Sequence, residues 1–239
     1  MKTVTLLLSS AMLLSLLACN NEPAKQEETK ADTTVATKPP EPAPFQPFKV
    51  IMIQHKVKDY GKWLPVYKAD DSARMANGIN QFVIGRDLAD SNMVYVTDII
   101  SDVTKAKAFG SSAGLKAAMQ KGGVIGAPKV SFAELIRLDS STIPQKERMM
   151  VAHHVKDFDA WLKVYDAEGK ATRASNGMVD RAMARGVDDP NMVYLVFAIT
   201  DMEKAKARGN SPEMKKIMEQ AGVDSKPIIT MYRIADVVK

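Results

Sequence analysis

The feature that most constrains this chain is an internal repeat that spans most of its length. The segment His55–Tyr67 (HKVKDYGKWLPVY) returns as His153–Tyr165 (HHVKDFDAWLKVY), and the chain's two tryptophans occupy matching places in it. Further matches follow in the same order: Asn77-Gly78 with Asn176-Gly177, Asn92–Tyr95 with Asn191–Tyr194, and Pro128 with Pro227. Matches this dense indicate duplication, so we expect both copies to share one fold.

Each copy contains roughly 90 residues, enough for one small domain. In the first copy, the apolar pattern predicts strands over residues 50–57, 81–86, 93–100 and 129–138. Asp59 is a plausible N-cap for a first helix that ends near Asn77-Gly78. Asp102 and Ser112 are placed to cap the two halves of a second helix, and Ser211-Pro212 supports the same division in the second copy. The resulting order, β-α-β-β-α-β, is the ferredoxin-like split motif.

Two strands of each copy are apolar on both faces, as in Val50–His55 and Met93–Asp98. Two helices cover only one face of such a sheet, so the other face needs a partner. The nearest partner is the other copy. We therefore predict an α+β fold with repeats at 48–139 and 148–239 and a linker at 140–147. The two ferredoxin-like repeats are expected to pack sheet to sheet as an intrachain pseudo-dimeric α+β barrel, so that the folded part is monomeric.

This order of elements and the opening motif H-x-V-x-D-[YF]-x-x-W resemble the dimeric α+β barrel superfamily, which includes antibiotic-biosynthesis-monooxygenase-like proteins. The resemblance covers each copy over its full length. It implies that a cofactor-free member would hold a phenolic substrate in an apolar pocket, with a base and groups that stabilise the anion. Haem-dependent members usually use a helical histidine as axial ligand, and neither predicted helix of either copy has one. We therefore expect no cofactor.

The N-terminus has the pattern of a targeting segment rather than of a folded domain. Lys2 precedes an apolar stretch over residues 4–17, which ends in the tetrapeptide Leu16–Cys19. This tetrapeptide resembles the bacterial lipobox, which implies a signal peptide at 1–18 and lipidation of Cys19. The alternative is an ordinary secretory signal that happens to end in cysteine. Residues 19–47 hold half of the prolines and predict an extended tether.

These features predict a bacterial cell-envelope protein anchored to the membrane by the lipid on Cys19. Asn20 follows the cysteine, which favours the outer membrane if enterobacterial sorting rules apply. The net charge is +5 with a pI of about 9.1, and the basic residues are spread along the chain. We therefore expect no nucleic-acid partner. With one cysteine and three histidines, a metal site is not expected.

Several side chains are candidates for a small-molecule site. His55 and His153, at the end of the first strand, are catalytic candidates as general bases; the alternative is a packed histidine bonded to backbone. The remaining candidates are for ligand binding: Trp63, Tyr67, Arg74, Tyr95, Trp161, Tyr165, Arg173 and Tyr194. For the aromatic helix residues core packing is the favoured alternative, and for the arginines it is the helix dipole. We expect His55, Trp63 and Tyr95 to meet in one site.

Three functions remain open from the sequence. The first is a lipoprotein that binds a small apolar or aromatic molecule. The second is a cofactor-independent monooxygenase or isomerase that acts on a phenol or quinol. The third is a structural or partner-binding lipoprotein without a small-molecule site. Asp98 is replaced by Phe197 in the second copy, so we expect at most one copy to be catalytic.

Overall fold

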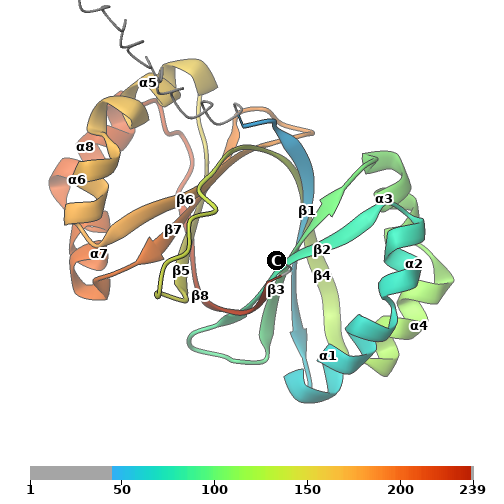
Figure 1. Cartoon of the computed structure of the whole chain (residues 1–239). Coiled ribbons are helices and arrows are strands. Elements are labelled where there is room, and N and C mark those ends of the chain that lie inside the picture. Colours follow the sequence, from blue (N-terminus) through green and yellow to red (C-terminus); the bar gives the residue numbers. More distant parts are fainter. Residues whose placement is uncertain (1–44, 238–239) are drawn as a thin grey trace, which may run out of the picture. The chain divides into compact units, whose positions relative to one another are not determined.

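Strands from both repeats form one closed antiparallel barrel in the part of the chain that this computed structural model describes, residues 45–237. Around the barrel the order is β1-β3-β2-β8-β5-β7-β6-β4 (Figure 1). The strand bounds are β1 Phe48–Val57, β2 Ile79–Asp87, β3 Met93–Ile100, β4 Val124–Leu138, β5 Glu147–His154, β6 Met178–Gly186, β7 Met192–Ile199 and β8 Ile228–Val237. Each repeat thus supplies four strands, and the predicted pseudo-dimeric α+β barrel is confirmed.

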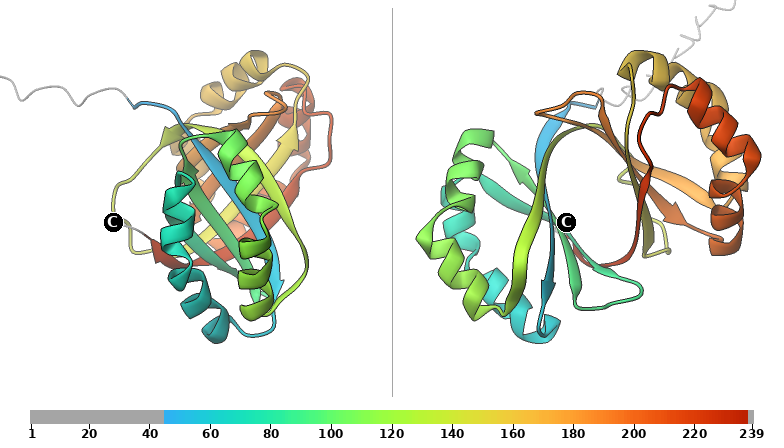
Figure 2. Two further views of the ribbon diagram at one scale, coloured as in Figure 1. Left: turned by 90° about the vertical axis from the view of Figure 1, so that its right-hand side faces the viewer. Right: turned by 180° about the vertical axis from the view of Figure 1, so that it is seen from behind.

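The helices lie outside the barrel in two groups, one for each repeat, on opposite sides (Figures 1 and 2). The helix bounds are α1 Tyr60–Ala69, α2 Asp71–Ala76, α3 Val103–Gly110, α4 Ala113–Lys121, α5 Phe158–Glu168, α6 Lys170–Ser175, α7 Met202–Gly209 and α8 Pro212–Gln220. No helix within residues 45–237 combines the length and the apolar character needed to cross a membrane.

The predicted helix caps are confirmed. The side chain of Asp59 accepts a hydrogen bond from the backbone amide of Lys62 at 3.0 Å. Asp102, Ser112 and Ser211 accept equivalent bonds at the starts of α3, α4 and α8. These bonds satisfy amides that have no partner within the first helical turn. The predicted division of the second helix therefore exists in both repeats.

The sequence pattern predicted that the first helix of each repeat runs without a break to the Asn-Gly pair. This prediction is wrong. The helix breaks at Asp70 in the first repeat and at Gly169 in the second, where Gly169 has φ +80°. Only glycine adopts such a φ at little cost. The break reorients the short helices α2 and α6, and each of them buries one arginine against its repeat.

The two sheets are joined along their edges by hydrogen-bonded strand pairs. Strand β2 pairs with β8, and β4 pairs with β6, so that the fourth strand of each repeat pairs with the second strand of the other. A barrel closed in this way leaves no long edge strand unpaired among the described residues. Strand β4 also starts earlier than predicted, at Val124, because it continues to pair with β1 beyond an irregularity at Gln54–Lys56.

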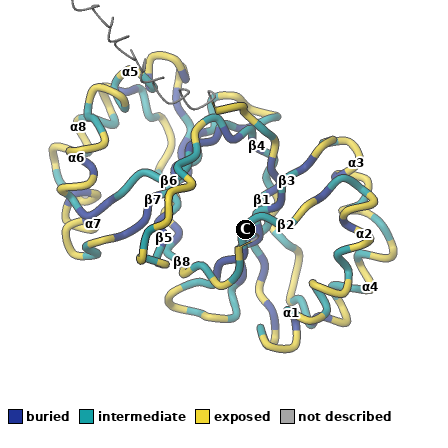
Figure 3. The backbone as a smooth tube through the Cα atoms, viewed as in Figure 1, coloured by how far each residue is buried: buried dark blue, intermediate teal, exposed yellow. Residues whose placement is uncertain are grey.

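Burial alternates along the strands, as expected where one face lies under helices and the other faces the barrel interior (Figure 3). In β3, the buried residues Val94, Val96, Asp98 and Ile100 alternate with partly buried ones. The apolar cores therefore lie between sheet and helices. The predicted signal peptide, Cys19 and most of the predicted tether lie outside the described residues.

Candidate functional site

Each repeat has a partly open cavity between its helices and the helix-facing side of its sheet. The cavity of the first repeat, here called cavity 1, has a volume of about 450 Å³. Its counterpart in the second repeat, cavity 2, has a volume of about 300 Å³. Apolar side chains dominate both walls, and volumes of this size are typical of small-molecule sites. The cavity 1 wall includes Ile51, Ile53, Phe109, Leu115, Met119 and Phe132.

His55 lines cavity 1 and His153 lines cavity 2, each from the first strand of its repeat. Neither ring nitrogen of either histidine has a hydrogen-bond partner, which makes them exceptions among the buried polar groups of residues 45–237. The suggestion that these histidines bond to backbone is therefore wrong. Burial without a partner lowers the pKa of each imidazole to about 4, so both are neutral at pH 7.

A row of planar groups in contact, in which the histidine ring is tilted and the tryptophan and tyrosine rings are stacked, forms one wall of each cavity. In the first repeat the His55 ring lies 5.3 Å from the Trp63 ring, and Trp63 stacks on Tyr67 at 4.9 Å. The guanidinium of Arg74 lies 3.7 Å from the centre of the Tyr67 ring. This spacing follows from the helix, because Trp63 and Tyr67 are four residues apart and therefore share one face.

The second repeat has the same row. The ring distances are 5.6 Å from His153 to Trp161 and 5.2 Å from Trp161 to Tyr165. Arg173 lies 3.8 Å from the centre of the Tyr165 ring. We call each set of four residues the aromatic wall. Its members all line the cavity, so an aromatic ligand would contact them directly.

The far end of cavity 1, away from His55, carries a buried carboxylate and a buried guanidinium. Asp98 is 1% exposed and accepts hydrogen bonds from the Tyr67 hydroxyl at 2.9 and 3.2 Å. Desolvation raises the pKa of Asp98 to about 6, and the bond from Tyr67 and the charge of Arg74 only partly offset this effect. Arg74 donates to the Tyr67 carbonyl and to Asp71, but its Nε has no partner.

The far end of cavity 2 is built differently. Arg173 forms a bidentate pair with Asp180, at 2.8 Å from Nε and 2.7 Å from Nη2. Phe197 occupies the position of Asp98. Glu168 lies between Arg173 and Arg208, at 3.4 and 2.8 Å. The charges at this end are therefore paired with one another.

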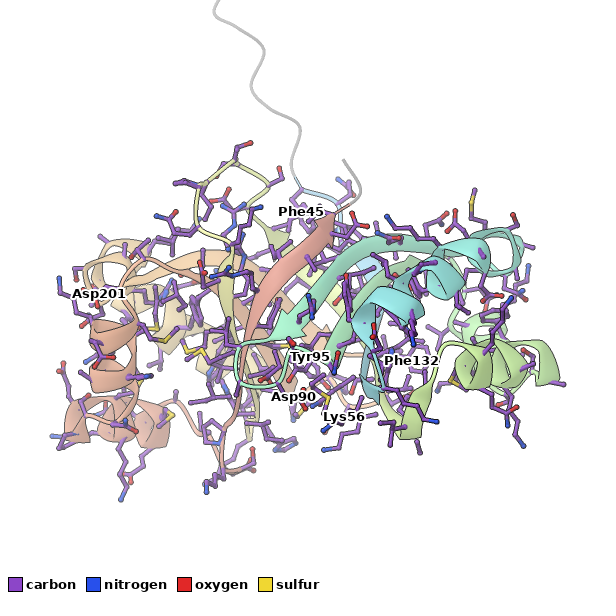
Figure 4. All side chains as sticks on the ribbon, turned by 90° about the horizontal axis from the view of Figure 1, so that it is seen from below. Phe45, Lys56, Asp90, Tyr95, Phe132 and Asp201 are labelled. Atoms are coloured by element: carbon purple, nitrogen blue, oxygen red, sulfur yellow. The ribbon has the colours of Figure 1, made fainter. Side chains whose placement is uncertain are left out.

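Tyr95 and Tyr194 do not line either cavity, so the expected meeting of Tyr95 with His55 and Trp63 is wrong. Successive residues of a strand point to opposite faces, and Val94 and Val96 take the helix-facing side. Tyr95 instead donates to Asp87 at 2.9 Å and packs against Tyr232 at 5.5 Å. Figure 4 shows Tyr95 near the middle of the barrel and Phe132 on the side of the repeat 1 helices.

The structure therefore brings together six of the eight ligand-binding candidates and both histidines, in two separate groups. The sequence analysis did not single out Glu168, Asp180 or Arg208. One signal was available: Arg208 replaces Phe109, a charge within an otherwise apolar pattern. Within residues 45–237, no three His, Cys, Asp or Glu side chains gather as they would around a metal ion.

Comparison with protein-family models finds no match, and comparison with curated proteins finds none either. Several solved structures are similar. An anthrone oxidase-like protein has a TM-score of 0.52 at 12% identity over 79% of this chain and 92% of that chain. A candidate monooxygenase from Fusobacterium nucleatum has a TM-score of 0.51 at 11% identity, over 80% of this chain and 93% of that chain.

A third similar structure is a candidate monooxygenase from Lactobacillus acidophilus, with a TM-score of 0.50 at 14% identity. It is matched over 94% of its length by 78% of this chain. At identities this low, the structural similarity shows a shared fold and nothing further. The chain thus shares its fold with these structures, and a shared activity remains a matter for proposal.

Proposed function

We propose that this protein binds small planar aromatic molecules, one in each cavity. The observation that carries the proposal is the pair of unpartnered imidazoles, each buried at one end of an apolar cavity beside an aromatic wall. A buried polar group without a partner costs roughly 1–3 kcal/mol. A ligand with one hydroxyl or carbonyl would supply the missing hydrogen bond and pack its ring against the apolar lining of the cavity.

The two tryptophans allow a direct test, because each lines a different cavity. Protein labelled with 5-fluorotryptophan has two ¹⁹F resonances, which Trp63→Phe and Trp161→Phe assign. Titration with 6-methoxy-2-naphthol is expected to shift both resonances saturably. Ala106→Phe fills cavity 1 and is expected to abolish the Trp63 shift alone, whereas the matched variant Ala205→Phe abolishes the Trp161 shift alone. Unchanged resonances in the wild-type protein would refute the proposal.

A second candidate is a reaction of a phenolic ligand in cavity 1, as in a cofactor-independent monooxygenase or isomerase. The observation in its favour is the pKa of Asp98, about 6, which leaves a buried base close to neutral pH. A phenol with a pKa near 10 is about 4 pKa units above Asp98 and about 6 above His55. Asp98 is therefore the better acceptor for a phenolic proton, with His55 orienting the ligand.

Dioxygen consumption with 2,6-dihydroxynaphthalene tests the oxygenase form of this candidate, and product analysis by mass spectrometry and NMR tests the isomerase form. Activity lost in Asp98→Asn and retained in Asp180→Asn would support it. No turnover in either assay would leave the protein as a binding protein.

We propose further that the chain is a lipoprotein of the bacterial cell envelope, anchored in the outer membrane through a lipid on Cys19. The tetrapeptide Leu16–Cys19 supports this proposal.

A further inference from the structure

Two ion pairs join the repeats at equivalent places of the barrel, and their charges are reversed. At the first junction, where β2 pairs with β8, Lys68 of α1 lies 2.9 Å from Asp236. At the second junction, where β4 pairs with β6, Arg137 donates to both carboxylate oxygens of Asp166 in α5, at 2.5 and 2.9 Å. In the alignment of the two repeats, Lys68 corresponds to Asp166, and Arg137 corresponds to Asp236. The helix therefore supplies the cation at one junction and the anion at the other.

These charges would not match if two identical repeats paired. A barrel of two first repeats would place Lys68 against Arg137 at both junctions. A barrel of two second repeats would place Asp166 against Asp236. All four side chains are partly exposed, so each single contact has a small effect. Both contacts change from attraction to repulsion together, however, and like charges that face each other disfavour a wrong partner.

Packing inside the barrel shows the same complementarity. At the first junction the Tyr232 ring lies so close to Gly85 that an added Cβ would be 2.8 Å from Cε2. The corresponding residues at the second junction are two buried alanines, Ala133 and Ala184. Two first repeats would place Gly85 against Ala133 and leave space unfilled at both junctions. Two second repeats would place Ala184 against Tyr232 and force a methyl group into the ring.

We propose that the surface by which the two repeats meet is specific, so that the first repeat recognises the second and excludes a second copy of itself. Charge and shape at both junctions fit only this pairing. Pairing of like repeats between two chains keeps the same strand pairing but loses the matching contacts, so the specificity favours the monomer. The inference concerns assembly and does not depend on the proposed binding of ligands.

An exchange of two residues inverts the charges without changing the composition. Arg137→Asp/Asp236→Arg gives like charges at both junctions of a single chain, and opposite charges where like repeats of two chains pair. Each contact is expected to contribute roughly two- to tenfold, so the refolded full chain should show at least a tenfold higher oligomer-to-monomer ratio than the wild type by light scattering. Salt at 1 M is expected to reduce this difference, because it screens exposed charges.

The matched control adds the second exchange, Lys68→Asp/Asp166→Lys, to the first. All four charges are then inverted, each junction of the single chain again has opposite charges, and the wild-type ratio of oligomer to monomer is expected to return. Domain swapping cannot explain such a result, because a swapped dimer still pairs the first repeat with the second.

A separate exchange tests the packing. Gly85→Ala/Ala184→Gly places a methyl group against Tyr232 within one chain, whereas like repeats of two chains then fit. It is expected to raise the oligomer-to-monomer ratio, and adding Ala133→Tyr/Tyr232→Ala is expected to restore the monomer.

The outcomes of the two exchanges decide the inference. An oligomer-to-monomer ratio equal to that of the wild type in both exchange variants would overturn it. A rise with one exchange alone would assign the specificity to that set of contacts. An exchange variant that fails to fold, beside a matched control that folds, would also support the inference, because the control restores complementary residues at both junctions.

Discussion

The hydroxyl of Tyr67 donates to both carboxylate oxygens of Asp98, at 2.9 and 3.2 Å, inside a cavity whose walls are mostly apolar. The second repeat keeps the tyrosine as Tyr165 but has Phe197 in place of the carboxylate. There, Asp180 on the neighbouring strand supplies the negative charge and pairs with Arg173. The two repeats thus share the aromatic wall and differ in where the buried charge lies and in what neutralises it.

Asp98→Asn is expected to stabilise the protein at pH 7.5. The pKa of Asp98 is raised from 3.8 to about 6, so its ionised form is less stable in the folded chain than in the unfolded chain. The amide removes this cost and can still accept from Tyr67. We expect the free energy of unfolding to rise by about 1–3 kcal/mol at pH 7.5, and the gain to vanish below pH 4. Urea denaturation at both pH values measures it, and a loss of stability at pH 7.5 would contradict the raised pKa.

The buried histidines are expected to make the protein less stable as the pH falls. Their pKa is about 4 in the folded chain, whereas an exposed histidine has an ordinary value of 6.5, so the unfolded chain binds more protons between these values. The full free energy of unfolding is therefore present above pH 6.5, and each histidine lowers it progressively as the pH falls from 6.5 towards 4. The loss amounts to about 2 kcal/mol for each histidine at pH 5.

Asp98 acts in the opposite direction, because its raised pKa makes the folded state bind a proton first as the pH falls. The comparison should therefore use the double variant His55→Gln/His153→Gln, which keeps Asp98. Between pH 7.5 and pH 5, the histidines are expected to lower the free energy of unfolding of the wild type by about 4 kcal/mol. The double variant is expected to lack this loss. Parallel pH dependences would show that the histidines are not desolvated as described.

Gly85→Ala is expected to destabilise the barrel by about 1–3 kcal/mol. A Cβ at Gly85 would lie 2.8 Å from Cε2 of Tyr232, a buried ring in the barrel interior. In the alignment of the two repeats, Gly85 corresponds to Ala184, and Tyr232 of the second repeat corresponds to Ala133 of the first. The equivalent place on the other side of the barrel therefore has two alanines. The double variant Gly85→Ala/Tyr232→Ala is therefore expected to lose less stability than the two single variants together. Additive losses in urea denaturation would contradict this account.

A single repeat is expected to self-associate. In residues 45–139 alone, β2 and β4 would lose their partners β8 and β6, which exposes two strand edges and the barrel-facing side of the sheet. In the full chain, the second strand of each repeat pairs with the fourth strand of the other. Two copies of one repeat can form the same two pairings and close the same barrel. Light scattering after size exclusion should give a dimer or aggregates for 45–139 and a monomer for 45–237. A stable monomer of 45–139 would show that the repeats fold independently.

Cys19→Ser is expected to abolish metabolic labelling with palmitate and to release the protein from the membrane fraction, or to leave it as an unprocessed precursor. Labelling of the variant at the wild-type level would remove the lipoprotein proposal.

The sequence was enough to predict the order of strands, most helix starts and the barrel, but not the breaks at Asp70 and Gly169. The repeat set the number of units, the apolar alternation of Val50–His55 and Met93–Asp98 marked strands in need of cover on both faces, and Asp59 and Ser112 marked helix starts. Apart from the repeat, these signals act over a few residues, since periodicity and capping are local properties of the backbone. The same local spacing also placed Trp63, Tyr67 and their counterparts on one helix face.

The tertiary structure decided which side chains share a cavity, because that depends on strand register and on helix direction beyond the reach of local patterns. Tyr95 and Asp98 are three residues apart on β3 and point to opposite faces, so only Asp98 reaches the aromatic wall. The break at Asp70 turns Arg74 into the same cavity. In the second repeat the charge moves to Asp180, which the pairing of β6 with β7 places opposite Phe197. No pattern along the chain could show that exchange, because it occurs between neighbouring strands.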